Sequence, residues 1–188
     1  MASAISHAVV ALTIGKTIPP AGFPASVLVL GMLCAIIPDA DVLGFRFGIE
    51  YGAPWGHRGL THSLFFAALL SGILTGLCYR LKSAVERWAF GGYFFGCTAS
   101  HGVLDAMTNG GLGVAFFSPF DQTRYFFSFR PVLVSPIGVG EFFTSYGMQV
   151  VLSEMLWIWL PASLFFMTGR LLLRLMNRRP VQSTPEIG

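Results

Sequence analysis

The sequence predicts an all-α integral membrane protein, a helical bundle of about five helices of which the first two are short. Of its 188 residues, 54% are hydrophobic and only 11% are charged, whereas soluble domains carry roughly 25% charged residues. The mean hydropathy is +0.66. A water-soluble domain would have to hide too much apolar surface, so a lipid bilayer is the expected partner. The net charge of +3 belongs to residues beside the helices and does not indicate nucleic-acid binding.

Five apolar runs are the candidate helices. The first begins almost at the N-terminus, contains His7, and lacks the basic residues that open a cleavable signal peptide. Only the last three runs approach the roughly 20 residues needed to cross a bilayer. The predicted helices cover residues 3–16, 24–37, 61–79, 88–107 and 148–173.

The remaining segments are expected to connect the helices or to end the chain. A proline-rich turn joins the first two helices, and residues 38–60 and 108–147 form polar, glycine-containing loops. We expect residues 1–178 to form one membrane-embedded domain. Residues 179–188 are expected to be a disordered polar tail, because they lack the apolar side chains that a packed core requires.

Basic residues predict the orientation of the bundle. The hairpin after the third helix and the end of the fifth are rich in lysine and arginine, so the positive-inside rule places both in the cytoplasm. With alternating helices, the N-terminus lies outside and the C-terminus inside. The eight basic residues then inside are Lys16, Arg80, Lys82, Arg87, Arg170, Arg174, Arg178 and Arg179. The four outside are Arg46, Arg58, Arg124 and Arg130.

The same alternation brings histidines and aspartates to the non-cytoplasmic side. His101 lies about 20 Å along the fourth helix from the cytoplasmic hairpin. Asp105 follows it by four residues and therefore faces the same way. The other candidates come from the first helix, the PDAD loop and the GHRGLTH motif. The full set is His7, Asp39, Asp41, His57, His62, His101 and Asp105.

A mixed set of imidazoles and carboxylates suits Zn²⁺, and also Mn²⁺ or Fe²⁺. Seven candidates exceed the four ligands of one tetrahedral ion and match two or more ions better. Two structural alternatives stay open: an aspartate pair in a loop commonly forms a turn, and polar residues can form an interfacial belt. Such belts favour tryptophan and tyrosine, so the sequence favours an interfacial metal site.

The order of these motifs resembles the YdjM-like family of bacterial inner-membrane proteins, which are described as metal-dependent hydrolases. After His7 the motifs are PDAD at 38–41, GHRGLTHS at 56–63, SHGVLDAMTNGG at 100–111 and SP at 118–119. More distantly, the order is similar to that of the zinc-dependent phospholipase C superfamily, all-helical enzymes with three zinc ions.

The resemblance implies a multi-pass protein of the bacterial inner membrane. It implies metal ligands at His7, Asp39, His57, His62, His101 and Asp105, with His57 and His62 as alternatives in the more distant pattern. No histidine follows His101, so one or two ions, most plausibly zinc, are expected in place of three. Late carboxylates that could replace the missing ligands are Glu141 and Glu154.

The outer loop 108–147 offers a side for substrate binding. Arg124 and Arg130 lie there among many aromatic residues, and a guanidinium group can hold two phosphate oxygens at once. The alternative is that Arg124 pairs with Asp121 while the aromatics form an interface belt. Within GHRGLTH, Arg58 either neutralises a phosphate or pairs with Asp39 or Asp41.

The leading functional hypothesis is a membrane-bound hydrolase that uses metal-activated water to cleave a phosphoester in a lipid or lipid-linked substrate. Asp41 or Asp39 would accept the proton, and Arg58 is the second candidate catalytic residue. Three alternatives stay open. They are an amide or acyl-ester hydrolase, a metal transporter, which would place its ligands nearer mid-membrane, and a non-catalytic membrane protein.

Overall fold

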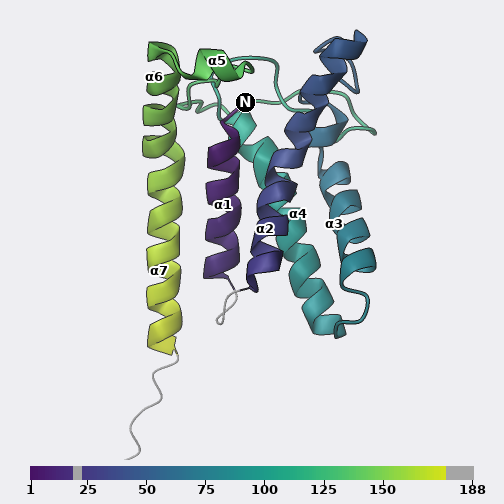
Figure 1. Cartoon of the computed structure of the whole chain (residues 1–188), viewed down its shortest axis with the longest axis vertical. Helices are drawn as coiled ribbons and strands as arrows, with labels where there is room; N and C mark the ends of the chain where they lie inside the picture. The colour runs from purple at the N-terminus through teal and green to yellow at the C-terminus, as the bar shows by residue number, and fades with distance from the viewer. Residues whose placement is uncertain (19–22, 177–188) are drawn as a thin grey trace, which may run out of the picture.

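The protein is described here by a computed structural model that covers residues 1–18 and 23–176. Within those ranges it is helical and contains no β-sheet. The long helices run side by side, and the longest connecting loops gather at the end of the bundle that holds the N-terminus (Figure 1).

The elements are α1 (Ala4–Thr17), α2 (Ala25–Ile36), the 3₁₀ helix η1 (Ile37–Phe47), the 3₁₀ turn η2 (Leu60–His62), α3 (Leu64–Cys78), α4 (Ala84–Ala106), α5 (Val139–Phe142), α6 (Ser145–Glu154), the π-helical segment η3 (Met155–Trp159) and α7 (Leu160–Met176).

The helical class is confirmed, and each of the five predicted helices has a counterpart. The predicted loop at 38–60 is partly wrong, because α2 continues directly into η1 and stays helical to Phe47. Pro38 is tolerated there because it occupies the first turn of η1, where an amide proton is not required. The predicted tail at 179–188 lies outside the described residues.

Two helical segments of the described chain are long and apolar enough to cross a membrane, judged by length and composition: Ala25–Phe47 and Ser145–Met176. The prediction that only the last three helices approach the length needed to cross a bilayer is therefore wrong, because the segment that begins with the second helix also reaches it. The second helix gains its length from η1, while α3 has only 15 residues. Helix α4 has 23 residues but carries charged side chains near both ends.

Helices α1, α2 and α4 pack around Tyr93, whose hydroxyl group donates a hydrogen bond to the carbonyl oxygen of Ala11 over 3.1 Å. Gly31 on α2 faces the same ring, and a Cβ added there would lie 2.4 Å from it. Helix α3 joins the bundle through Ser71, whose hydroxyl donates to the carbonyl of Gly91 over 2.6 Å. These contacts fix α1, α2 and α4 relative to one another, and His7, His101 and Asp105 of the candidate site lie on α1 and α4.

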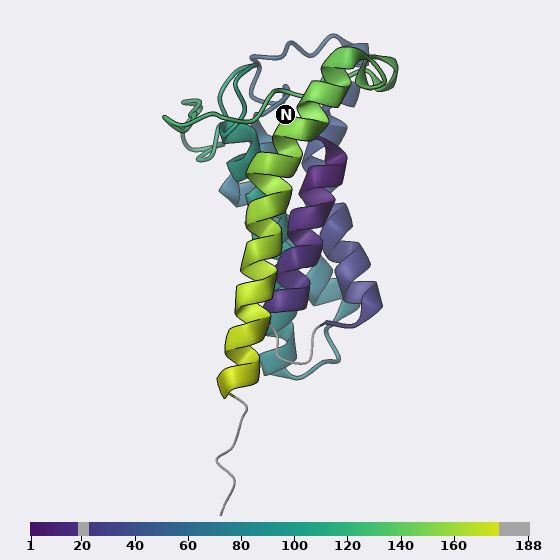
Figure 2. The ribbon, with the colours of Figure 1, turned by 90° about the vertical axis from the view of Figure 1, so that its left-hand side faces the viewer.

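The segment from α6 to α7 is one continuous rod that passes α1 in both ribbon views (Figures 1 and 2). Glu154 is fully buried where the rod meets the start of α1. It accepts hydrogen bonds from the hydroxyl groups of Ser3 and Ser6 and from the backbone amide of Ser3. Trp159 donates its indole proton to Ser6 over 2.8 Å. The carboxylate of Glu154 thus fastens the rod to the first turn of α1.

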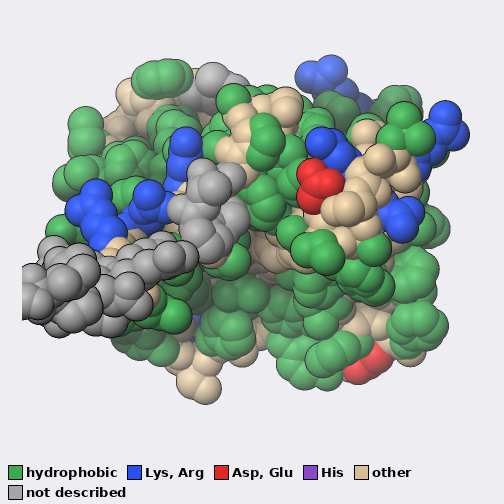
Figure 3. Space-filling view, turned by 90° about the horizontal axis from the view of Figure 1, so that it is seen from below, with side chains coloured by type: hydrophobic (Ala, Val, Ile, Leu, Met, Phe, Trp, Pro, Cys, Tyr) green, Lys and Arg blue, Asp and Glu red, His purple; other side chains and the backbone are tan. Residues whose placement is uncertain are grey.

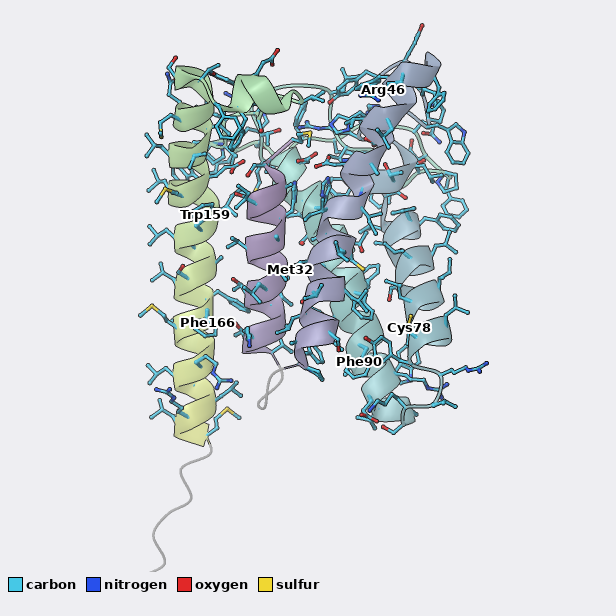
Figure 4. All side chains as sticks on the ribbon, viewed as in Figure 1. Met32, Arg46, Cys78, Phe90, Trp159 and Phe166 are labelled. Carbon is cyan, nitrogen blue, oxygen red and sulfur yellow. The ribbon has the colours of Figure 1, made fainter. Side chains whose placement is uncertain are left out.

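The two ends of the bundle differ in chemistry. Arg46 lies at the end with the loops, whereas Cys78 and Phe90 lie toward the other end (Figure 4). Seen from that second end, several lysine and arginine side chains lie on an otherwise largely apolar surface, most of them in the upper half of the view (Figure 3). Large apolar side chains are exposed along the outer faces of the helices, such as Leu77 at 74% and Leu164 at 53%. Exposed apolar surface on this scale marks contact with a membrane or a partner.

We predict that Gly31→Ala destabilises the bundle by about 1–3 kcal/mol, because the new methyl group would overpack the ring of Tyr93. Gly96→Ala on α4 is the matched control, since a Cβ there meets nothing within 4 Å. It should leave stability unchanged or raise it by up to about 1 kcal/mol. Denaturant unfolding in detergent measures both. Equal effects of the two substitutions would contradict this packing.

Candidate metal centre

The predicted histidines and aspartates meet at the end of the bundle that carries the N-terminus. His101 and Asp105 lie one turn apart on α4, and His7 lies on the facing surface of α1. Asp39 and Asp41 come from η1, and His62 comes from η2. The side chains of His7, His101 and Asp105 are completely buried. Four separate stretches of sequence therefore place polar groups in one cluster.

Four side-chain atoms in this cluster surround a common point. They are Asp39 Oδ1, His62 Nε2, His101 Nε2 and Asp105 Oδ2. The measured separations between pairs of these atoms run from 3.0 Å, between the two imidazole nitrogens, to 3.8 Å, between His101 and Asp105. A tetrahedral zinc ion with bonds of about 2.0–2.1 Å separates its ligands by about 3.3 Å. The four atoms thus have the spacing of a tetrahedral metal cage.

Neighbouring groups orient three of these four ligands. His101 donates its Nδ1 proton to the carbonyl of Ala35 over 2.7 Å, which leaves Nε2 as the nitrogen that faces the cage. His62 Nδ1 lies 3.2 Å from Asp41 Oδ2. Asp105 accepts from the amide of Ala2 on Oδ1 over 2.8 Å. Such outer partners are a regular feature of metal sites, where they fix ring tautomers and carboxylate orientation.

Three carboxylates lie in and beside the cluster, those of Asp39, Asp41 and Asp105. Both oxygens of Asp39 and Oδ2 of Asp105 are buried without a hydrogen-bond donor, which is costly for a carboxylate away from water. Burial alone would lower the pKa of His62, but the carboxylates of Asp105, Asp39 and Asp41 raise it to about 10. The buried oxygens and the raised pKa both indicate a site that attracts a cation.

A second set of close ligand atoms comprises Asp41, His57 and His62. Asp41 Oδ1 lies 2.7 Å from His57 Nδ1, and its other oxygen accepts a hydrogen bond from the hydroxyl of Thr61 over 2.7 Å. His62 belongs to both sets through its two ring nitrogens. The distance of 2.7 Å is typical of a direct hydrogen bond. This set is therefore better suited to orienting His62 than to holding a second tetrahedral ion.

His7 lies beside both sets and belongs to neither. Its ring stacks on that of His101, with centroids 3.8 Å apart, and its Nε2 lies 3.6 Å from Asp105 Oδ1. Neither ring nitrogen has a hydrogen-bond partner. Its predicted role as a ligand stays a prediction, as does that of His57.

Arg58 is fully buried and faces Asp105, with 3.3 Å between Nε and Oδ2. Its other guanidinium nitrogens donate to Thr108 Oγ1 and to the carbonyls of Gly110 and Leu112. The structure therefore pairs Arg58 with Asp105, where the sequence had offered Asp39 or Asp41. This position depends on a tight loop, because a Cβ at Gly56 would lie only 2.1 Å from a backbone oxygen.

The two predicted substrate-binding arginines lie in different surroundings. Arg124 donates to four backbone carbonyls, those of Tyr51, Ala53, His57 and Gly113. It thus joins the loop before the GHRGLTH motif to the later loop 108–147, and among the ion pairs of the described residues none links it to Asp121. Arg130 is exposed and lies over the ring of Phe126 at 4.6 Å. The binding of substrate by either arginine stays a prediction.

Sequence reasoning gave no role to three groups that support the site. Thr61 and Thr108 stand inside the quoted motifs, and a threonine beside charged residues is a signal for a hydrogen-bonding role. The carbonyl of Ala35 could not have been found, because a backbone acceptor leaves no trace in residue identity. Of the two late carboxylates, Glu154 contacts α1 and Glu141 is exposed on α5.

Comparison with known proteins relates the chain to inner membrane proteins. Residues 1–181 match the profile of the family described as YdjM inner membrane protein. The chain is 38% identical over 166 residues to the inner membrane protein YbcI of Escherichia coli strain K12, an alignment that covers 87% of this chain and 94% of the relative. No solved structure matches the chain. The chain therefore belongs to the YdjM inner membrane protein family.

Proposed function

We propose that this protein is a multi-pass, metal-dependent hydrolase of the bacterial inner membrane, with its site on the non-cytoplasmic side. The cage formed by Asp39, His62, His101 and Asp105 is the observation that carries the proposal. The orientation is supported by the basic residues that cluster at the opposite end of the bundle, on the α3–α4 hairpin and the end of α7 (Figure 3). Under the positive-inside rule that end faces the cytoplasm.

A divalent ion in the cage, zinc in the first instance and manganese as the alternative, would supply Lewis acidity and a water of lowered pKa. Side chains of this chain fill the remaining roles. The four cage residues would hold the ion, and Arg58 offsets part of the charge of Asp105. Asp41 lies just outside the cage, bound to His57 and Thr61, and is the proposed proton acceptor.

The proposed substrate is a phosphoester in a lipid or lipid-linked molecule. A groove of about 360 Å³ between α1 and α2, lined only by apolar residues, includes Ala8 and Ile36. The groove includes residues of the same helical turns as His7 and Asp39, and we propose that it takes an acyl chain of the substrate. Arg130, exposed on the outer loop, is the proposed phosphate contact.

We predict that purified protein in detergent holds one tightly bound divalent ion per chain. His62→Ala and His101→Ala should each abolish stoichiometric binding, because each removes a ligand of the cage. Metal content by mass spectrometry measures this, with circular dichroism to confirm folding. Glu141→Ala, which removes an exposed carboxylate at the same end, is the control and should retain the metal. Wild-type protein that stays free of metal after incubation with Zn²⁺ or Mn²⁺ would contradict the proposal.

We further predict that metal-loaded protein releases phosphate or a phosphorylated headgroup from phospholipid phosphoesters in mixed micelles. Asp41→Asn should keep the metal but lower kcat by roughly 10²–10⁴-fold, the contribution of a general base. Asp121→Asn, an outer-loop carboxylate bound to Thr123, should retain full activity. Hydrolysis of acyl esters or amides without phosphoester cleavage would instead favour the alternative hydrolase. Metal binding without hydrolysis of any phosphoester, acyl ester or amide would contradict the proposal that the protein is an enzyme.

A further inference from the structure

A second groove lies at the opposite end of the bundle from the metal centre. It has a volume of about 580 Å³ and runs between α3 and α4. Small residues form its floor, among them Gly72 and Gly76 on α3 and Gly92 on α4, and a Cβ at any of these three would meet nothing within 4 Å. The missing side chains therefore leave an open channel on the outer surface of the helix pair.

The length of the groove matches one leaflet of a bilayer. On α4 its lining extends from Ala84 to Phe95, about 16 Å of helix. Half of the hydrocarbon core of a membrane measures about 15 Å. The lining is mostly apolar, with Ser71, Thr75 and Arg87 as its polar members. A single acyl chain laid along the groove would remain within one leaflet.

Polar groups occur at the end where a lipid headgroup would lie. Arg87 and Trp88 line the groove one turn after the start of α4. Arg87 has no ion pair among the described residues, because the nearby Glu86 is paired with Lys82 at 3.4 Å. Within the groove, Thr75 Oγ1 is buried without a hydrogen-bond partner. A phosphate in the groove would pair with the guanidinium group of Arg87.

We propose that this groove binds one anionic phospholipid, with its phosphate on Arg87 and an acyl chain on the glycine-lined floor. The inference rests on the membrane placement proposed above and is independent of hydrolase activity. A second copy of the chain is the competing occupant, since close glycines favour helix packing in membranes. A twofold contact would, however, bring Arg87 toward its own counterpart, and this charge repulsion favours a lipid.

Native mass spectrometry with added phosphatidylglycerol or phosphatidylcholine tests the proposal. Wild-type protein should bind one phosphatidylglycerol about tenfold more tightly than phosphatidylcholine, the effect of one charge-assisted contact. Arg87→Gln should abolish that preference. Gly72→Leu should weaken the binding of both lipids, because the new side chain fills the groove, and Gly76→Leu provides the same test if that variant does not fold.

Two controls match these variants. Gly96→Leu places a leucine in open space on α4 outside the groove, and Arg46→Gln removes an exposed arginine at the other end. Both should bind phosphatidylglycerol as wild type does. Equal binding of the two lipids by wild type would overturn the proposal, as would unchanged binding by Gly72→Leu. A wild-type dimer that Gly72→Leu separates would assign the groove to a second copy. Metal content is measured in parallel on the same variants. It separates a failure of the lipid-binding proposal from a failure of the metal-centre proposal.

Discussion

The buried carboxylates of Asp39 and Asp105 are the constraint on which this end of the structure depends. Both oxygens of Asp39 and one of Asp105 lack a hydrogen-bond donor, and an uncompensated buried carboxylate costs several kcal/mol. Arg58 forms an ion pair with Asp105, and the N-terminal ammonium group lies near the same carboxylate. A divalent ion between the carboxylates and the imidazoles of His62 and His101 would compensate both aspartates at once.

Much of the surrounding fold can be understood as support for this arrangement. Tyr93 holds α1, α2 and α4 together, and Glu154 fastens the long C-terminal rod to the first turn of α1. That turn places the amide of Ala2 on Asp105. The carbonyl that orients His101 comes from Ala35 near the end of α2. Helix packing and metal-site geometry are therefore coupled through a few hydrogen bonds.

Apolar runs predicted the helices, and the i, i+4 spacing predicted that His101 and Asp105 face the same way. The alternation of the helices, set by the basic residues of their connections, predicted that the other candidates lie at the same end. The sequence did not predict that η1 would extend α2, since Pro38 resembles a helix stop unless it occupies the first turn. Nor could it separate the cage from its surroundings. His7 and His62 look alike in sequence, and only packing places one beside the cage and the other within it.

X-ray absorption spectroscopy of the zinc-loaded protein tests the central claim most directly. If Asp39, His62, His101 and Asp105 form the cage, the spectrum should show four nitrogen or oxygen neighbours at about 2.0–2.1 Å. It should also show the outer-shell scattering of two imidazoles. A six-coordinate oxygen shell without imidazole scattering, or sulfur neighbours at about 2.3 Å, would contradict the assignment.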